Sequence, residues 1–191
     1  MTAVVGEDGV RRCPWAMSAP EYIPYHDHEW GRAVHGDDAV FERLVLEAFQ
    51  SGLSFITILR KRGAFRAAFA GFSIEAVAQF TEADAERLMS DTGIIRNRAK
   101  ITASLANARA AMAVPEGLSE LVWSFAPTRR RAAPKLDTDI PAVTPESTAM
   151  AKELKRRGFQ FVGPTTAYAH MQATGMVNDH LASCHAREFC P

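Results

Sequence analysis

The stretch 91–97, which reads Asp-Thr-Gly-Ile-Ile-Arg-Asn, lies between two segments whose residue patterns both predict helices. Residues 82–90 follow Thr81, and Asp84 stands three residues after this threonine, which is a variant of the capping box that begins helices. From 98 to about 112, apolar side chains recur at three- and four-residue spacing, as they do in a helix with one buried face. The sequence therefore predicts a helix, a tight turn and a second helix in direct succession.

This turn combines several features that bind anions. Gly93 permits tight backbone geometry, and the N-terminus of the second helix presents unpaired N–H groups. Arg96, Arg98 and Lys100 add positive charge at the same place. A helix-hairpin-helix unit holds a DNA backbone in this way without reading the bases. Every helical hairpin has such a turn, however, so the pattern alone is not specific.

The composition indicates one well-buried domain, or at most two small ones, because 191 residues with 47% hydrophobic content can form an extensive core. The 22 basic and 22 acidic residues cancel, so binding to nucleic acid would depend on local charge. Basic side chains gather in 60–66, 96–100, 129–131 and 152–157, although solvated helix faces explain such groups more often. We find neither a membrane span nor a signal peptide, and expect a cytoplasmic protein.

The remaining pattern is helical, with no alternation of strands and helices. A buried helix is predicted between 37 and 51, with Asp37 or Asp38 as its N-cap and Gly52 as its terminator. The next helix is expected to start near Ser54 and to be interrupted by Gly63. Further helices are predicted after Ser73, at 118–125, from Thr144 to Gly158, and at 165–174. Only 159–162 looks extended, and 126–145 is a proline-rich connection that either drapes over the surface or is partly mobile.

Cysteine and histidine residues gather near both ends of the chain. Cys13 and His26 lie near the N-terminus, while His180 and Cys184 are four residues apart near the C-terminus. Zinc favours this mixture of ligands in closed structural sites, and the four-residue spacing places the second pair on one side of a helical turn. Such a site would join the two terminal segments. Alternatives are buried cysteines with solvent-facing histidines, or other ligands from His28, His185 and Cys190.

A third feature is an aromatic segment followed by one acid on an apolar helix. Between 13 and 30 the chain holds Trp15, Tyr22, Tyr25 and Trp30, which could stack on a planar ligand or anchor an ordinary core. Glu47 lies on a helix that is apolar around most of its circumference. An exposed ion pair with Arg43, one turn earlier, is the simpler interpretation. A buried, unpaired Glu47 would instead require a cationic or hydrogen-bond-donating ligand.

The chain resembles the type I 3-methyladenine DNA glycosylases, which belong to the helix-hairpin-helix glycosylase superfamily. The resemblance extends from about Arg11 to Cys184 and rests on long, ordered motifs. These are RCPW at 12–15, YHDHEWG at 25–31, LE at 46–47, GLSFIT at 52–57, TGIIRNR at 92–98, KRRGF at 155–159, MQA at 171–173 with Gly175, VNDH at 177–180, and Cys184.

The resemblance implies an all-α protein with a single glycosylase domain at 11–191, made of two helical lobes with the hairpin at about 91–98, after an N-terminal extension at 1–10. It implies a structural zinc ion bound by Cys13, His26, His180 and Cys184. It also implies that Glu47 and Tyr25 are the catalytic residues that contact the extruded base, with Trp15, Tyr22 and Phe55 as base-binding residues. The family commonly has tryptophan at position 55, and phenylalanine keeps a stacking face but loses area and the indole N–H. The hairpin residues that would contact the DNA backbone are Gly93, Arg96 and Arg98.

The implied activity is hydrolysis of the N-glycosidic bond of 3-methyladenine in alkylated double-stranded DNA. Methylation at N3 makes adenine a cation, so the base leaves as a neutral molecule and needs little protonation. Residues 99–114 contain no acid, and the hairpin lacks the lysine that bifunctional relatives use, although Lys100 is nearby. We therefore expect a monofunctional enzyme. We also expect a monomer, because the sequence has no self-complementary apolar stripe, and no membrane partner. The alternatives are a non-catalytic DNA-backbone or damage-binding module and a broader alkylpurine glycosylase.

Overall fold

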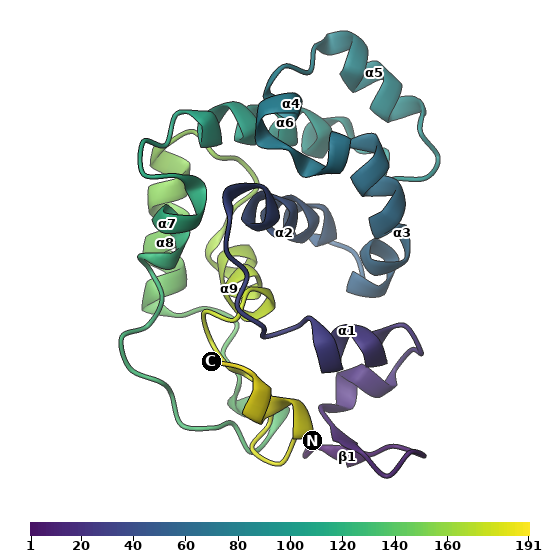
Figure 1. Cartoon of the computed structure of the whole chain (residues 1–191), viewed down its shortest axis with the longest axis vertical. Helices are drawn as coiled ribbons and strands as arrows, with labels where there is room; N and C mark the ends of the chain where they lie inside the picture. The colour runs from purple at the N-terminus through teal and green to yellow at the C-terminus, as the bar shows by residue number, and fades with distance from the viewer.

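The chain forms nine α-helices, and the computed structural model describes all residues from 1 to 191 (Figure 1). The α-helices are α1 (Tyr22–His28), α2 (Asp37–Gln50), α3 (Phe55–Ala68), α4 (Ile74–Ala78), α5 (Glu82–Ser90), α6 (Arg98–Met112), α7 (Leu118–Trp123), α8 (Pro145–Arg156) and α9 (Pro164–Ala173). Short 3-10 helices cover Pro14–Met17, Ala70–Phe72, Asp137–Asp139 and His185–Phe189. The expected helical fold class is confirmed for the body of the chain.

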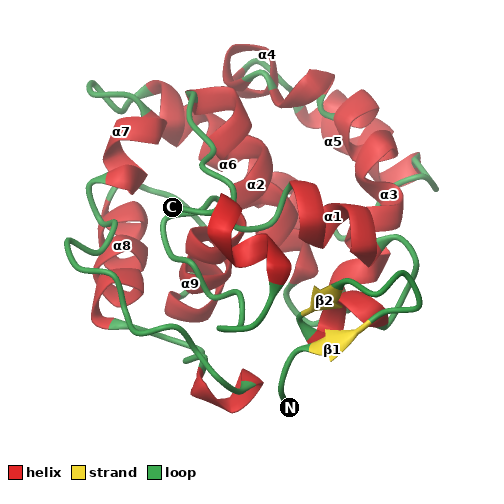
Figure 2. Ribbon diagram, turned by 60° about the horizontal axis from the view of Figure 1, so that its bottom comes forward, coloured by secondary structure: helices red, strands yellow, loops and turns green.

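A small sheet near the N-terminus is the one departure from the all-helical expectation. Strand β1 (Val4–Val5) pairs in antiparallel fashion with strand β2 (Arg11–Arg12). Both strands lie beside α1 in Figure 2. Strands of two residues are too short to show the alternating pattern that identifies a strand in a sequence. The expected extension at 1–10 thus supplies one strand of this sheet.

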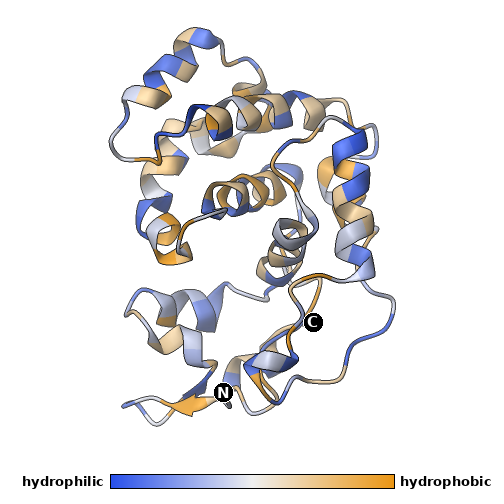
Figure 3. Cartoon of the chain, turned by 180° about the vertical axis from the view of Figure 1, so that it is seen from behind, coloured by the Kyte–Doolittle hydropathy of each residue, from blue (hydrophilic) through white to orange (hydrophobic).

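Helix α2 lies at the centre of the molecule, where it packs against α3, α6, α7 and α9. Its buried apolar side chains have the predicted helical spacing and include Val40, Phe41, Leu44, Val45, Ala48 and Phe49. Full burial of a side chain of this size contributes ~2 kcal/mol. Figure 3 shows the complementary pattern, with hydrophilic residues along the outer faces of the surrounding helices. The core therefore holds α2 in a fixed position.

The predicted N-caps of α2 are wrong. Gly36 occupies the N-cap position, and Asp37 and Asp38 lie in the first turn of the helix. Their carboxylates bind neighbouring helices instead: Asp37 accepts a hydrogen bond from the Ser119 backbone N–H at 2.8 Å, and Asp38 accepts one from the Ile74 N–H at 2.8 Å. Both N–H groups are in first helical turns, where the helix itself offers no partner. Asp37 and Asp38 therefore cap α7 and α4, two helices that reach them only in the folded protein.

Gly63 does not interrupt α3, which continues to Ala68. A glycine inside a helix costs about 1 kcal/mol relative to alanine. Ile58 and Phe65, on either side of it, are both completely buried, and their burial outweighs that cost.

Residues 159–162 were expected to be extended, but they form no strand. The side chain of Asn107 on α6 binds the backbone of Gln160 instead: its Oδ1 accepts from the Gln160 N–H at 2.7 Å, and its Nδ2 donates to the Gln160 carbonyl at 3.1 Å. Phe161 has a φ of 56°. The apolar side chains of Phe159 and Val162 are buried, but no neighbouring strand pairs with this segment. The prediction of an extended segment was wrong because it relied on apolar character alone.

Local capping signals predicted the starts of α5 and α8 and the end of α8 correctly. Thr81 and Asp84 form the expected capping box of α5, and the carboxylate of Asp84 accepts the Thr81 N–H at 2.8 Å. Thr144 caps α8, which ends before Gly158 with a φ of 94°. Asn97 caps α6 by accepting the Lys100 N–H at 3.1 Å. The predicted helix, turn and helix around 91–97 are therefore present.

The two ends of the chain meet on one side of the molecule, opposite α4 and α5 (Figure 1). Strand β2 and helix α1 both contact the 3-10 helix His185–Phe189. The proline-rich connection 126–145 lies over this part of the surface, which was one of the two expectations for it. The Ala182 N–H donates to the Pro134 carbonyl at 2.7 Å, and the Asp137 N–H donates to the Met1 carbonyl at 3.1 Å. No helix combines the length and apolar character needed to cross a bilayer.

Candidate active site and metal cluster

A cavity of about 310 Å³ opens between α1, α2, α3 and α9. Its walls include all five residues expected to be catalytic or base-binding: Trp15, Tyr22, Tyr25, Glu47 and Phe55. The 3-10 helix Pro14–Met17 supplies the tryptophan, α1 supplies both tyrosines, and Phe55 is the first residue of α3. Residues that are 40 positions apart in the sequence thus share one site.

The aromatic walls pack on one another at defined angles. The rings of Tyr22 and Phe55 are parallel within 9°, with centroids 6.5 Å apart, and Trp15 meets Tyr22 edge-on at 5.4 Å. Tyr25 lies 5.0 Å from Phe55 at a tilt of 42°. These contacts hold the rings around the cavity, where their faces can stack on a planar ligand.

Glu47 is buried, with 7% of its surface exposed, and no group of the protein hydrogen-bonds its carboxyl. The ion pair with Arg43 that the spacing allowed is absent. Arg43 donates instead to Glu29 at 3.2 Å, and Arg62 of α3 binds the same carboxylate at 2.5 and 2.8 Å. Burial raises the pKa of Glu47 to about 7, although the nearby charge of Arg43 acts in the opposite direction. The cavity therefore contains an acid that no protein group hydrogen-bonds, and a bound ligand could supply the missing partner.

The cavity has further wall residues that were not expected to contact a ligand. They include Gln50, Leu53, Ser54 and Gln172. Leu53 has 42% of its surface exposed and contributes an apolar side chain at the cavity wall. The motifs GLSFIT and MQA contain several of these residues, so the resemblance marked the segments without indicating individual roles.

The basic groups of the hairpin are not equivalent. Arg96 is exposed, and it forms no ion pair within the protein, whereas Arg98 binds Glu82 at 3.0 Å and Glu86 at 2.7 Å. Lys100 is buried, and its Nζ donates to the backbone carbonyls of Phe49 and Ser51 at the end of α2. Lys100 therefore binds the C-terminus of α2 and does not add to an exposed anion site, contrary to expectation.

Gly93 is required by close packing and not by a left-handed conformation. It is absent from the glycines with positive φ, but a Cβ atom at this position would lie 3.0 Å from Ala64 Cβ and 2.9 Å from Asp91 Oδ1. The Gly93 N–H donates to that carboxylate at 2.7 Å, and Lys61 Nζ donates to the Gly93 carbonyl at 3.0 Å. The hairpin is thus fixed tightly against α3.

Most of the other basic clusters form ion pairs on the surface. Arg60 and Arg66 bind acids at 2.8 Å, and Arg156 binds Glu153 at 2.6 Å. Residues 129–131 line a second cavity of about 210 Å³ together with Arg187, and Arg131 also lies 3.9 Å from a carboxylate oxygen of Asp179.

The four expected zinc ligands lie together and are all buried: Cys13, His26, His180 and Cys184. Their ligand atoms all lie within 4.8 Å of one another. Cys184 Sγ is 3.4 Å from His26 Nε2 and 3.6 Å from His180 Nδ1, and Cys13 Sγ is 3.8 Å from His180 Nδ1. Zn–S bonds of about 2.3 Å and Zn–N bonds of about 2.0 Å place neighbouring ligands of a tetrahedron about 3.5 Å apart. The donor set therefore fits a tetrahedral metal ion.

The outer ring nitrogens of the two cluster histidines also have partners, as is usual for metal-binding histidines. His26 Nδ1 is 2.7 Å from Asp27 Oδ1, and His180 Nε2 is 3.1 Å from the Trp30 carbonyl. Burial alone would raise the pKa of Asp27, but hydrogen bonds, first of all from Arg12, hold it well below its usual range.

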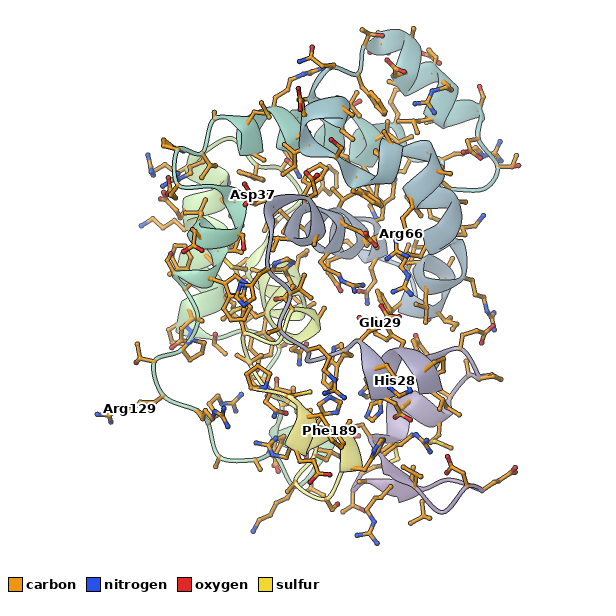
Figure 4. The ribbon with its side chains drawn as sticks, viewed as in Figure 1. His28, Glu29, Asp37, Arg66, Arg129 and Phe189 are labelled. Carbon is orange, nitrogen blue, oxygen red and sulfur yellow. The ribbon has the colours of Figure 1, made fainter.

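The alternative ligands do not enter this cluster. His28 is exposed on α1 (Figure 4), His185 binds Asp27 at 2.8 Å, and the Cys190 thiol faces backbone carbonyls. His180 and Cys184 themselves lie on a turn, closed by a hydrogen bond from the Cys184 N–H to the Leu181 carbonyl at 2.8 Å, and not on the expected helical turn.

The α5–α6 hairpin and the buried acid in an aromatic cavity are the features expected from the resemblance to helical base-excising glycosylases. The model of the methyladenine glycosylase family matches residues 15–188, and the chain belongs to this family. It is 44% identical to DNA-3-methyladenine glycosylase 1 of Escherichia coli K12 over 179 residues, which are 92% of this chain and 96% of the relative.

Solved structures agree with this assignment. A crystal structure of 3-methyladenine DNA glycosylase I superimposes with a TM-score of 0.87 at 45% identity, covering 91% of this chain and 98% of the other. A Tyr-to-Phe variant of a 3-methyladenine DNA glycosylase I, solved in complex with 3-methyladenine, gives a TM-score of 0.87 at 32% identity, with 92% and 97% coverage.

Proposed function

We propose that this protein is a monofunctional DNA glycosylase that hydrolyses the N-glycosidic bond of 3-methyladenine in alkylated double-stranded DNA. The observation that carries the proposal is Glu47, a buried acid with no protein partner in a cavity of aromatic rings. The relative of known structure with 3-methyladenine bound supports the same ligand.

The substrate explains why such a carboxyl can be tolerated. A base in a duplex must be flipped out before its glycosidic bond is accessible, and alkylation weakens its pairing. The flipped base is a cation, which aromatic faces attract and which gives Glu47 the opposite charge that it lacks in the protein. We propose that the Glu47 carboxylate accepts hydrogen bonds from N–H groups of the base, while Tyr25, Trp15 and Tyr22 enclose it and Phe55 stacks on it.

The chemical step then needs little from the protein. The bond between the sugar C1′ and the base nitrogen breaks, and its electron pair neutralises the cationic ring. A water molecule adds to C1′ and releases a proton. Lys100 is held by two carbonyls of α2 and is therefore not available as a nucleophile, which supports an enzyme that leaves the DNA strand uncut.

Contacts with DNA are proposed on the face that carries the cavity and the hairpin. Arg96 is the cation of the hairpin that forms no ion pair within the protein, and we propose that it binds a DNA phosphate. Gly93 allows the hairpin to pack closely on α3. Arg98 contributes less to phosphate binding, because Glu82 and Glu86 already pair with it. Leu53 is an exposed apolar group on the cavity wall. We propose that it fills the space that the flipped base leaves in the stack.

The cysteine and histidine cluster is proposed to bind a structural zinc ion. Cys13, His26, His180 and Cys184 would complete a closed shell, which has no position for a catalytic water molecule. Trp15 follows the first ligand closely, and Tyr25 directly precedes the second. The ion would therefore also hold part of the aromatic wall in place.

Product analysis tests this function. The protein is incubated with methylated duplex DNA, and the released bases and any strand breaks are quantified. We expect free 3-methyladenine, little 7-methylguanine and intact strands. Binding without base release would show a non-catalytic DNA-damage or DNA-backbone binding module, and comparable release of both bases would show a broader alkylpurine glycosylase.

A further inference from the structure

Gln172, a wall residue of the cavity, is held in one orientation by a residue that is not part of the cavity wall. Gln172 of α9 lines the cavity, and its Nε2 donates to Asp179 Oδ2 at 3.0 Å. Asp179 is itself buried, with 4% of its surface exposed, and it accepts a second hydrogen bond from Tyr168 Oη at 2.5 Å. Arg131 Nη1 lies 3.9 Å from the other carboxylate oxygen. This buried group is therefore anchored on several sides.

The chemistry of the two side chains decides which end of the amide faces Asp179. A carboxylate only accepts hydrogen bonds, whereas an amide has a donor end and an acceptor end. The NH₂ group of Gln172 must therefore point to Asp179. Its carbonyl oxygen Oε1 has no hydrogen-bond partner in the protein, and it belongs to a residue of the cavity wall.

We propose that Asp179 is a positioning residue that holds Gln172 with its carbonyl toward the bound base, so that Gln172 determines specificity for adenine-type bases. This inference rests on the proposed function and adds a second acceptor to the one that Glu47 provides. Adenine presents an exocyclic N6 amino group, a donor, where guanine presents the acceptor O6. A fixed carbonyl stabilises the former and repels the latter.

Gln50 shows what the fixed orientation adds. It is the other amide of the cavity wall, and its side chain forms no hydrogen bond with the protein. Gln50 is free to turn either end toward a ligand, so it can accept a donor or an acceptor equally well. Of these two amides, only Gln172 can therefore distinguish a donor from an acceptor.

Two variants and one control test the inference. Q172M removes the carbonyl at nearly constant volume, and D179A releases the amide of Gln172 so that it can turn. Y168F removes a hydrogen bond from the same buried carboxylate but leaves the bond to Gln172 intact. Binding of free 3-methyladenine and 7-methylguanine is measured by calorimetry, together with release of both bases from methylated DNA and thermal unfolding.

We expect Q172M to bind 3-methyladenine about 10-fold more weakly than the wild type, as loss of one hydrogen bond in a buried site predicts. D179A should lower the preference for 3-methyladenine over 7-methylguanine by about 10-fold. Y168F should keep the wild-type preference even if it unfolds at a lower temperature, which separates cavity effects from stability.

Wild-type affinity in Q172M, or an unchanged preference in D179A, would overturn the inference. A wild-type protein that neither binds nor releases 3-methyladenine would instead overturn the proposed function, so the two failures are distinguishable.

Discussion

At Glu47, a single carboxyl couples binding to stability. Its pKa of about 7 in the folded protein lies above the ordinary glutamate value of 4.5, because burial disfavours the charge. Below pH 4.5 this carboxyl is protonated in both the folded and the unfolded state, so its burial costs no stability. As pH rises from 4.5 through 7, the unfolded state ionises first, and the free energy of unfolding falls. This loss of stability arises because the folded protein buries a carboxylate that a bound cation would neutralise.

We predict that E47Q is more stable than the wild type at pH 8, by up to ~3 kcal/mol, and that this difference shrinks toward pH 5. Glutamine keeps the shape but cannot ionise. Urea unfolding of both proteins at pH 5, 6, 7 and 8 measures the difference. A difference that does not change with pH would mean that Glu47 is not held in an apolar site.

His170 of α9 should show the opposite dependence on pH. Burial lowers its pKa to about 3, and neither ring nitrogen has a hydrogen-bond partner. Above its unfolded pKa of 6.5 the ring is neutral in both states, and stability is lost as pH falls from there toward 3.

We expect the variant H170F to gain stability over the wild type as pH falls from 7 to 5, because phenylalanine cannot take up a proton. The free energies of unfolding of the two proteins across this range provide the check. Parallel curves would contradict the burial of an unprotonated ring.

The hairpin between α5 and α6 illustrates how an element depends on one close contact. We predict that G93A loses about 1–3 kcal/mol, because its Cβ would lie 3.0 Å from Ala64 Cβ and over-packing has this typical cost. G63A is the matched control, since nothing lies within 4 Å of its added Cβ inside α3, and it should gain about 0.5–1 kcal/mol.

Thermal unfolding of both variants, with binding to undamaged duplex DNA, separates the two effects. G93A should also bind DNA more weakly. Equal stability of G93A and the wild type would show that the hairpin does not pack on α3 as described.

The elements differ in how far the sequence alone predicted them. Helices with local caps, such as α5 after Thr81 and α8 after Thr144, were predicted because the signal and the helix are adjacent. Asp37 and Asp38 misled the prediction because they cap helices that approach only in the folded protein. The sheet β1–β2 was missed because its strands are shorter than any periodic pattern.

The candidate site shows the same division. Its residue types could be singled out, but spacing left Glu47 equally compatible with an ion pair to Arg43. Only the packing of α1 and α3 shows that Arg43 binds Glu29 instead. The contact between Gln172 and Asp179 has no signal in the sequence, because a loop after α9 creates it.

The whole molecule has two hydrophobic cores of unequal size. The larger contains 33 buried residues from α2 to beyond α9, whereas the terminal segments share only four: Cys13, Leu181, Cys184 and Ala186. So small a core stabilises little by itself, which is where a metal ion contributes most.

We therefore predict about one tightly bound zinc ion per chain by elemental analysis. C13S should lose the metal and expose the terminal segments to protease while most helical circular dichroism remains, since the large core does not include them. C190S is the matched control and should retain the metal, because this thiol lies outside the cluster. A fully folded, metal-free wild type would contradict the zinc site.

Single-turnover release of 3-methyladenine from methylated duplex DNA by the wild type and E47A tests the central claim most directly. The account predicts that the wild type releases the base and that E47A, although folded, is at least ~100-fold slower, because the group that holds the reacting base in position is lost. An E47A protein that released 3-methyladenine at the wild-type rate would contradict it.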